Sequence, residues 1–333
     1  MYYRKWIISL SLIIAFVYLL LATAYITVDP EQFFNKSITK HKFRYTNYFS
    51  KYQYEKLKSS KYSLVFGTSR SLKISTQAQG SPFLNFHNLY GEPAEVLNFL
   101  KQLDDRQIKN INSIYFLVSI NTMIAEEKEL LDYSKNSFFD KVYASFPLNM
   151  KKLKYMLKDI SINLLNKKTN FYIADDGSKF VYDKNIGAKI PKNNNTEVKT
   201  RTYDKQAINE LLKIDEFCKK RDVSIVYYTP TYSDQHLADF PLADLKKMWK
   251  DLLDGGIDGF YALYYLENIS NKQEENYYPL FTDSSHLNYS MMNNVFKQHI
   301  VHENKKYYIS TQNIEEYFNI NNNTKFQKTT PKD

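Results

Sequence analysis

The sequence predicts an α/β domain with a parallel central sheet, behind an N-terminal helix that crosses a membrane. Two observations lead to this prediction. Short runs rich in β-branched and aromatic residues alternate with amphipathic helical segments, as happens when helices cover both faces of a parallel sheet. In front of them, residues 6–28 form an uncharged, mostly apolar run. Such a run is long enough to cross the roughly 30 Å hydrocarbon layer as a helix.

The N-terminal run has two possible fates. Ala22-Thr23-Ala24 has the small-x-small form of a signal-peptidase site, so a cleaved signal peptide is one of them. The apolar stretch continues past that site, which favours an uncleaved anchor over residues 1–28. Arg4 and Lys5 favour an inside N-terminus, although basic residues also crowd the other flank. We therefore expect a single-pass protein of the inner (cytoplasmic) membrane with an extracytoplasmic domain.

The remaining elements follow in order along the chain. Residues 29–61 are polar, basic and rich in tyrosine, which predicts a juxtamembrane linker with one short helix over 48–57. The α/β domain is expected over 62–319, and a polar, low-complexity, disordered tail over 320–333. The predicted strands are residues 63–66, 83–87, 113–120 and 223–229. Apolar residues at helical spacing predict helices within 93–103, 206–220, 245–253 and 292–300.

One stretch breaks the alternation of strands and helices, and we expect it to be an insertion over residues 138–201. Residues 138–168 have a helical and basic pattern. Residues 171–182 predict a β-hairpin around Asp176-Gly177. The Asn/Lys-rich residues 183–201 predict a return loop.

Composition limits the possible partners. The chain has 333 residues and a net charge of +9, which suits a surface held near anionic lipid or an anionic polymer. No Arg/Lys-rich helix, zinc pattern or glycine-aromatic RNA-binding motif accompanies this charge, so we expect no nucleic-acid partner. A basic nucleic-acid-binding protein would instead present one continuous basic face with strongly salt-dependent binding.

Cysteine and histidine usage gives no sign of a metal centre. The single cysteine, Cys218, excludes an intramolecular disulfide and a cysteine-built metal site, and its amphipathic surroundings predict core packing. His87 and His236 have no partner at metal-ligand spacing and are expected to be packing or surface residues. We expect neither a metal nor a cofactor.

Ser69 stands where an apolar run gives way to the small-residue turn Gly67-Thr68-Ser69-Arg70. Sites in parallel sheets form at the carboxyl ends of strands, and a glycine there lets the backbone bend close to a substrate. Amide N–H groups after the turn can donate to an oxyanion. For this segment alone, an ordinary polar turn is the alternative.

Two other segments carry polar side chains suited to catalysis. Asp283 and His286 stand three apart before the last predicted helix, where the carboxylate can fix the tautomer of the histidine and stabilise its imidazolium. A polar loop that caps the helix is the alternative. Asn121 closes the strand predicted over 113–120, where its amide can donate to an oxyanion, and an ordinary turn asparagine is the alternative.

Taken in this order along the chain, the strand-Gly-x-Ser, Asn and Asp-x-x-His segments resemble the SGNH/GDSL hydrolase superfamily. The Gly-Thr-Ser-Arg form, the single span followed by Val28-Asp29-Pro30 and the late Asp-x-x-His-Leu-Asn look like its membrane-anchored cell-envelope branch. That branch resembles alginate O-acetyltransferase-like proteins and the D-alanyl transfer protein of teichoic-acid synthesis. The resemblance runs from the anchor to about residue 302 and implies a flavodoxin-like, three-layer α/β/α fold.

The resemblance implies a role for each matching residue. Ser69 would be the nucleophile, His286 its general base and acid, and Asp283 the orienting carboxylate. Asn121 and the amide of Ser69 would form the oxyanion hole, with Gly91 as a looser match to a second oxyanion glycine.

The chain also departs from the family pattern. The third block reads Ser119-Ile120-Asn121-Thr122 where the family has Gly-x-Asn-Asp. Arg70 replaces the commoner acidic neighbour of the nucleophile, and it can bind an anionic group on the substrate or pair with an acid. Tyr228 ends the 223–229 strand on the same edge, where such loops line the pocket, so it is a further candidate for substrate binding.

These expectations describe an enzyme that acts on acyl esters of a cell-envelope glycan through a serine acyl-enzyme. Hydrolysis and transfer share this route and differ in whether water or a sugar hydroxyl resolves the intermediate. Transfer needs activated acyl groups, which a multi-span membrane acyltransferase supplies in the resembling systems. The alternative is a non-catalytic envelope-assembly or glycan-binding protein on the same fold. Catalysis requires Ser69 Oγ within hydrogen-bond reach of His286.

Overall fold

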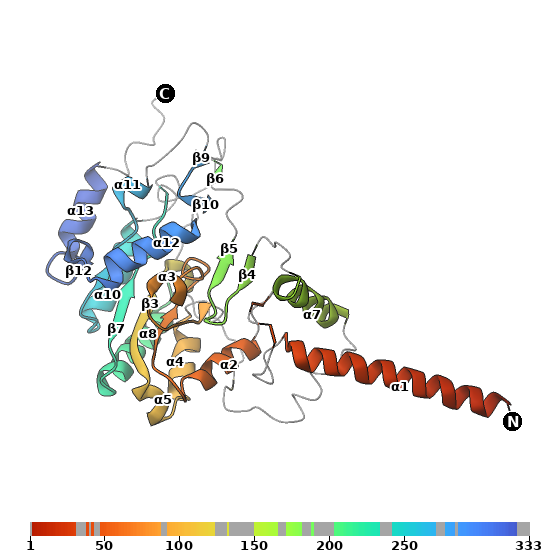
Figure 1. The fold of residues 1–333 in the computed structure, drawn as a ribbon. Coiled ribbons are helices and arrows are strands. Elements are labelled where there is room, and N and C mark those ends of the chain that lie inside the picture. Colours follow the sequence, from red (N-terminus) through yellow and green to blue (C-terminus); the bar gives the residue numbers. More distant parts are fainter. Residues whose placement is uncertain are drawn as a thin grey trace.

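A six-stranded, mostly parallel sheet forms the centre of the computed structural model, and the long helix α1 projects from one side of it (Figure 1). The structure describes residues 2–30, 38–39, 41–42, 47–87, 92–123, 132, 150–165, 171–181, 188–189, 203–233, 242–270, 277–283 and 286–324. The helices within these ranges are α1 (Tyr2–Val28), α2 (Asn47–Lys56), α3 (Thr76–Gln79), α4 (Pro93–Lys101), α5 (Asp105–Lys109), α7 (Met150–Asn163), α8 (Lys205–Lys220), α10 (Leu242–Asp254), α11 (Glu267–Ser270), α12 (Tyr289–Val295) and α13 (Ile314–Thr324). Shorter 3-10 or π turns are η2 (Ile120–Thr122), η3 (Phe296–Val301) and η4 (Lys305–Tyr307).

The central sheet has the strand order β12-β8-β7-β3-β1-β2. Its strands are β1 (Tyr62–Phe66), β2 (Phe83–Asn85), β3 (Ile111–Leu117), β7 (Ile225–Tyr228), β8 (Phe260–Tyr261) and β12 (Tyr308–Ile309). All neighbours are parallel except β12, which runs antiparallel to β8. The predicted α/β class and parallel sheet are therefore confirmed. The two-residue strands β8 and β12 escaped prediction because they are too short to show a period of two.

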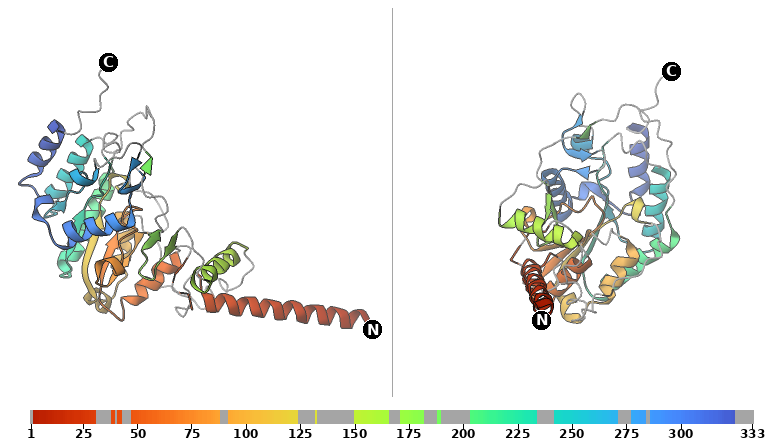
Figure 2. Two further views of the ribbon diagram at one scale, coloured as in Figure 1. Left: turned by 45° about the horizontal axis from the view of Figure 1, so that its top comes forward. Right: turned by 90° about the vertical axis from the view of Figure 1, so that its right-hand side faces the viewer.

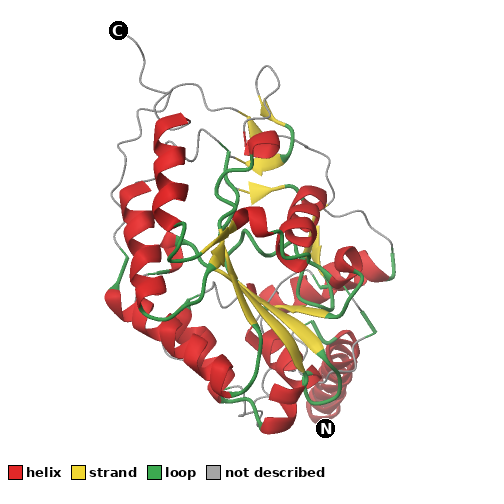
Figure 3. Ribbon diagram, turned by 90° about the vertical axis from the view of Figure 1, so that its left-hand side faces the viewer, coloured by secondary structure: helices red, strands yellow, loops and turns green. Residues whose placement is uncertain are grey.

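Side-chain alternation along the strands builds two apolar cores, one on each face of the sheet. In β1, Leu64 and Phe66 enter one core and Val65 enters the other. Helices α4, α5, α8, α10 and α13 cover the first face, whereas α12 and η3 cover the second. Figure 3 shows these helices on either side of the sheet. The sheet is therefore buried on both faces, as a parallel sheet requires.

Strands β1 and β3 lie side by side, but the chain leaves them toward opposite faces. After β1 it passes Ile74, which packs in the second core, whereas the connection from β3 returns through α8 in the first core. Neighbouring parallel strands whose connections diverge leave a crevice at their carboxyl ends, where α/β proteins bind ligands. The turn that carries Ser69 follows β1 at this edge.

Helix α1 contains one stretch, Tyr3–Val28, that is long and apolar enough to cross a membrane. A buried lysine, Lys42, closes its carboxyl end. The Nζ of Lys42 donates to the carbonyls of Val28 and Asp29 at 2.9 Å each and to Thr39 Oγ1 at 2.7 Å. A cation at this end of a helix also complements the helix dipole. Helix α1 thus ends in hydrogen bonds to a buried lysine.

Two elements cross the predicted boundaries. Tyr54 and Leu57, in α2 and just after it, pack in the first core, although the predicted linker extends over 29–61. Helix α13 continues to Thr324, into the tail predicted as disordered over 320–333. Residues 325–333 lie outside the described residues.

The structure describes the predicted insertion only in part. Helix α7 covers part of the helix expected over 138–168, and residues 138–149 lie outside the described residues, as does most of the predicted loop over 183–201. The predicted hairpin is confirmed as β4 (Phe171–Ile173) and β5 (Lys179–Val181), which pair antiparallel. Two further small ladders pair β6 (Ala188–Lys189) with β9 (Tyr277–Tyr278) and β10 (Phe281–Asp283) with β11 (His286–Leu287).

The hairpin turn docks on the central sheet. The carbonyl of Asp176 accepts hydrogen bonds from the amide of Asn85 at 2.7 Å and from Gln53 Nε2 at 2.8 Å, and its carboxylate accepts one from the amide of Thr76 at 2.7 Å. Gly177 follows with φ of 85°, and a Cβ there would lie 2.3 Å from the carbonyl oxygen of Asn85. The insertion is therefore tied to β2 and to the connection that follows Ser69 (Figure 2).

Replacing Gly177 by alanine tests this docking. Gly177→Ala combines left-handed backbone strain with overpacking, so we expect it to lower the free energy of unfolding by about 3 kcal/mol. Gly80→Ala is the matched control, because Gly80 also has a positive φ, 71°, yet an added Cβ there meets no atom within 4 Å. It should cost about 1 kcal/mol. Denaturant unfolding of the full chain in detergent, followed by near-ultraviolet circular dichroism, measures both, and equal losses would contradict the docking.

Candidate active site

The turn after β1 presents Ser69 at its corner. The carbonyl of Thr68 accepts hydrogen bonds from both the amide and the Oγ of Ser71, each at 2.9 Å, so Ser69 and Arg70 are the central residues of a β-turn. Thr68 and Ser71 are buried and Ser69 is exposed. A residue with a side chain would clash at position 67, since a Cβ would lie 2.6 Å from Ser71 Oγ and 2.8 Å from Leu117 Cβ. The backbone at Gly67 therefore lies close against β3, and the turn exposes the side chain of Ser69.

His286 lies on a small hairpin and not on the simple loop that the sequence predicted. Strand β10 pairs antiparallel with β11, and the register places Asp283 directly opposite His286. The side chain of Asp283 lies outside the described part of the structure. Helix α12 begins immediately after the hairpin, with Asn288 as its N-cap accepting from the amide of Met291. Hairpin and helix together fix the backbone on both sides of the histidine.

The structure brings Ser69 and His286 together. Ser69 Oγ lies 2.7 Å from His286 Nε2, although the two residues are 217 positions apart in the chain. This distance is that of a hydrogen bond, and Nε2 is the nitrogen that takes the proton in serine hydrolases. The histidine accepts from the serine when its proton is on Nδ1. Among the described contacts, none engages the amide N–H of Ser69, which leaves this donor for another acceptor.

Buried polar side chains hold the two segments in this position. Lys73 Nζ donates to the carbonyl of Leu287, the residue after His286, at 2.6 Å. Asn293, in α12, donates to the carbonyl of Lys73 at 2.8 Å and accepts from the amide of Ser75 at 3.2 Å. Gln79 Nε2 donates to the same asparagine side chain at 3.0 Å. The chain after the serine is therefore hydrogen-bonded to the chain that carries the histidine.

Aromatic packing adds rigidity beneath this network. The ring of Phe296, in the turn after α12, contacts Phe83 of β2, Tyr115 of β3 and Tyr228 of β7, with ring centres 5.1 to 5.9 Å apart. One side chain thus fixes α12 against three strands of the sheet.

Arg70 lies beside the serine, and its charge has no ion-pair partner among the described residues. Its guanidinium carbon is 5.0 Å from the centre of the Tyr232 ring, which is the geometry of a cation–π contact. Its Nε is buried and has no hydrogen-bond partner among the described residues, where no ion pair to this side chain occurs either. Within the described part of the chain, Arg70 therefore offers a donor next to the serine, and both roles considered for it remain predictions.

Other predicted site residues are placed differently. Tyr228 is fully buried under Phe296 and packs as a core residue, which argues against the predicted contact with substrate. Asn121 does not close a strand, because β3 ends at Leu117 and Asn121 lies in the 3-10 turn η2. Its side chain, like the whole of Gly91, lies outside what the structure describes.

Sequence reasoning missed three residues of this region: Lys73, Asn293 and Tyr232. For Asn293 a signal existed, because it stands three residues before Phe296 and seven before Ile300, on the apolar stripe of its helix. A polar residue in such a stripe needs buried partners. Nothing in the spacing of Lys73 or Tyr232 distinguishes them from surface residues.

The described histidines and the cysteine do not gather in a metal-binding group. Among the described residues, no group of three or more His, Cys, Asp or Glu side chains is placed to hold a metal ion. Burial lowers the pKa of His87 to about 4, with a smaller contribution from Lys179, so this histidine is uncharged at neutral pH. Cys218 is buried as predicted, and burial raises the pKa of its thiol to about 12, which makes it unreactive. His236 lies outside the described residues.

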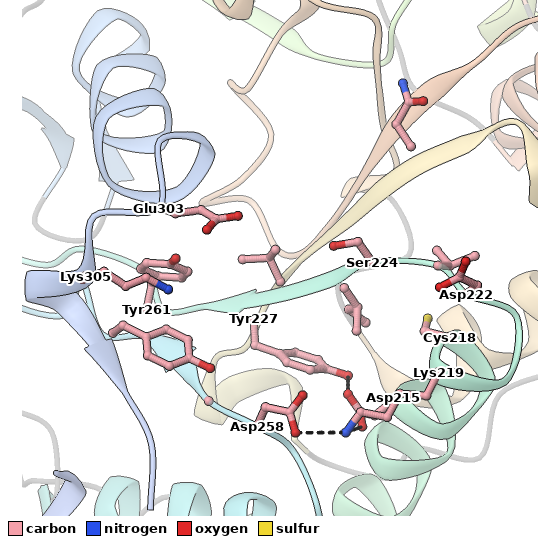
Figure 4. Close-up of a pocket in the computed structure, with 16 residues that line it drawn as sticks. Asp215, Cys218, Lys219, Asp222, Ser224, Tyr227, Asp258, Tyr261, Glu303 and Lys305 are labelled. Atoms are coloured by element: carbon pink, nitrogen blue, oxygen red, sulfur yellow. Dashed lines mark hydrogen bonds and ion pairs between the residues drawn. The ribbon is translucent and has the colours of Figure 1, made fainter. Parts of the chain in front are cut away.

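A cavity of about 640 Å³ lies elsewhere, at the amino ends of β7 and β8 (Figure 4). Part of its charged lining is internally paired: Lys219 Nζ lies 2.9 Å from Asp215 Oδ2 and 3.3 Å from Asp258 Oδ1, and Tyr227 donates to Asp215. Sites in parallel sheets form at the opposite, carboxyl edge. The expected position of a site therefore favours the Ser69 edge over this cavity.

No protein-family model matches this chain, and no curated protein matches it. The functional assignment therefore depends on the geometry of the site and on the sequence pattern around it.

Substitution of Asn293 tests whether the network holds the site. Asn293→Asp keeps the shape but removes the donor to the carbonyls of Lys73 and Tyr289, so we expect a loss of about 2–4 kcal/mol in unfolding free energy. The loss should shrink as the pH falls, because a protonated carboxyl regains one donor. The control is Asn294→Asp on the exposed side of the same helix, which should stay within about 0.5 kcal/mol. A similar loss at both positions, measured by denaturant unfolding, would refute the network.

Proposed function

We propose that this protein is a membrane-anchored, extracytoplasmic serine esterase or O-acyltransferase that acts on acyl esters of a cell-envelope glycan. One observation carries the proposal: Ser69 Oγ lies 2.7 Å from His286 Nε2 at the carboxyl edge of a parallel sheet. An exposed serine hydrogen-bonded to a histidine is the arrangement of an activated nucleophile and its base. The separation of 217 residues argues against a merely local contact.

The chemistry has two halves. Ser69 Oγ attacks the acyl carbon while His286 Nε2 takes the serine proton, and the alcohol then leaves with that proton as the acyl-enzyme forms. In the second half His286 takes a proton from water or a sugar hydroxyl, the new C–O bond forms, and Ser69 regains its proton. Asp283, opposite His286 in the hairpin register, is proposed to orient the imidazole.

The oxyanion needs donors near Ser69. The amide N–H of Ser69, which no described residue engages, is the first, and Asn121 and Gly91 are proposed to supply the others. Water as the acceptor gives an esterase, and a sugar hydroxyl gives a transferase. For transfer, we propose that a multi-span membrane acyltransferase delivers the acyl group, since this chain has one apolar helix of spanning length among its described residues.

Fold and anchor agree with the proposed family. The strand order β2-β1-β3-β7-β8 corresponds to the flavodoxin-like order 2-1-3-4-5, which supports an SGNH-type domain. Helix α1 runs without interruption through Ala22-Thr23-Ala24, and Tyr25 and Val28 beyond it pack against α7. This favours a retained single-pass anchor in the inner (cytoplasmic) membrane over a cleaved signal.

We further propose that Arg70 binds an anionic group of the substrate. Its buried Nε has no partner in the described part of the chain, and Tyr232 fixes the guanidinium plane beside Ser69. A carboxylate or phosphate near the ester would satisfy this donor.

A fluorophosphonate probe tests the nucleophile. We expect the full chain in detergent to be labelled, Ser69→Ala to lose labelling and His286→Ala to slow it by about 10²–10⁴-fold. The full chain is needed because Lys42 is held by the end of α1. Ser81→Ala, an exposed serine of the same β1–β2 connection, is the control and should label as the parent does. An unlabelled parent would favour the non-catalytic glycan-binding alternative, and equal labelling of Ser69→Ala would remove Ser69 from the mechanism.

Paired substrates test Arg70. We expect Arg70→Gln to lower kcat/KM for an acetyl ester that carries a carboxylate about tenfold more than for an uncharged acetyl ester, because a charge-assisted hydrogen bond is lost. The control is Arg106→Gln, at an exposed arginine of α5, which should not discriminate between the two esters. Equal losses on both esters would contradict anion binding by Arg70.

A further inference from the structure

The large exposed apolar side chains of the described residues gather in one region. Thirteen of the large ones belong to α1, as a membrane span requires. Outside α1, those of the described residues are Ile38, Met150, Leu157, Leu164 and Leu165. Four of these five belong to α7 or directly follow it. An apolar surface of this kind, gathered in one place among the described residues of the domain, indicates an interaction site.

This region lies at the end of α1. Met156, Leu153 and Ile160 of α7 pack on Tyr25 and Val28, in the last turn of the apolar helix. The amide of Ile38 donates to the carbonyl of Thr27 at 3.1 Å, which places the fifth exposed apolar residue at the same end. Where α1 leaves the hydrocarbon layer, α7 is therefore beside it.

The orientation of α7 suits a surface helix. In the right-hand view of Figure 2, which looks nearly along α1, helix α7 is seen from its side, so the two helices cross. A helix that crosses a spanning helix at its end lies close to the plane of the membrane surface. An interfacial helix has this position.

The sequence of α7 is amphipathic, as expected for a helix at a membrane surface. Met150, Leu157 and Leu164 recur every seven residues, so they share one face, next to the face that packs on α1. The helix also carries four lysines, Lys151, Lys152, Lys154 and Lys158, whereas its one acidic residue, Asp159, is buried. Long lysine side chains can reach lipid phosphates while an apolar face lies deeper.

We propose that α7 is an interfacial membrane helix, in which Met150, Leu157 and Leu164 enter the lipid beside the end of α1 and the lysines lie at the phosphate groups. The inference rests on the proposed membrane anchor and is independent of the proposed chemistry. A lipid surface is favoured over a protein partner because the patch is continuous with the apolar surface of α1 itself. It gives the domain two membrane contacts and so a fixed orientation on the bilayer.

Spin labels on single cysteines test the proposal in the full chain, reconstituted into phosphatidylcholine vesicles with phosphatidylglycerol as minor component. Cys218 is fully buried, so the native chain should take up no label and each variant should take up one. The variants are Leu157→Cys on the apolar face, Lys151→Cys on an exposed polar face of α7 and Leu12→Cys on α1. Collision with oxygen, which partitions into lipid, is compared with collision with a water-soluble nickel chelate.

We expect the ratio of oxygen to nickel collisions to be several-fold higher for Leu157→Cys than for Lys151→Cys, and high for Leu12→Cys. A low ratio at Leu157→Cys with a high ratio at Leu12→Cys would overturn the inference and leave the anchor intact. Exclusion of both reagents at Leu157→Cys would also overturn it, because it would indicate a protein partner or a second copy. Low ratios at both positions would mean that the proposed anchor itself fails.

Discussion

Hydrogen bonds between the segment after Ser69 and the start of α12 are the constraint on which the site depends. Neither segment fixes the position of Ser69 or His286 through its own contacts alone. Lys73 holds the carbonyl next to His286, and Asn293 holds the carbonyl of Lys73 in turn, so each segment supplies the partner that the other lacks. Such groups are costly when buried without partners, which makes the arrangement cooperative. The 2.7 Å contact between serine and histidine follows from this pairing.

Several contacts hold the backbone in place at the carboxyl edge of the sheet. Gly67 lets the turn close over β3, Phe296 fixes α12 on the sheet, and the Asp176 turn braces the connection between β1 and β2 from the other side. These contacts come from segments widely separated along the chain, including the insertion. The insertion therefore supports the chain that follows the Ser69 turn. A serine held at an exposed corner needs this support, since its own turn contributes few contacts.

The sequence predicted the fold class and the longer strands because these elements carry a recognisable local pattern. Strands β1, β3 and β7 are long enough to show their composition, and the Asp176-Gly177 turn has a characteristic pair of residues. Strands β8 and β12, with two residues each, exist only because neighbouring strands pair with them. In the site, Ser69 and His286 were found from motif and position, whereas Lys73 and Tyr232 act through contacts that span the whole chain and leave no local pattern.

The buried ammonium of Lys42 has a consequence for how far the protein can reach. Its backbone pairs with Ile173 of the hairpin, while its Nζ holds the end of α1, so one residue joins the membrane helix to the insertion and through it to the sheet. A domain on a flexible tether samples a volume set by the length of its linker. With the proposed membrane anchor, a domain clamped in this way works at one height above the bilayer. For the proposed glycan substrate, this means delivery to that height, which favours polymer chains that are still growing at, or attached to, the same membrane.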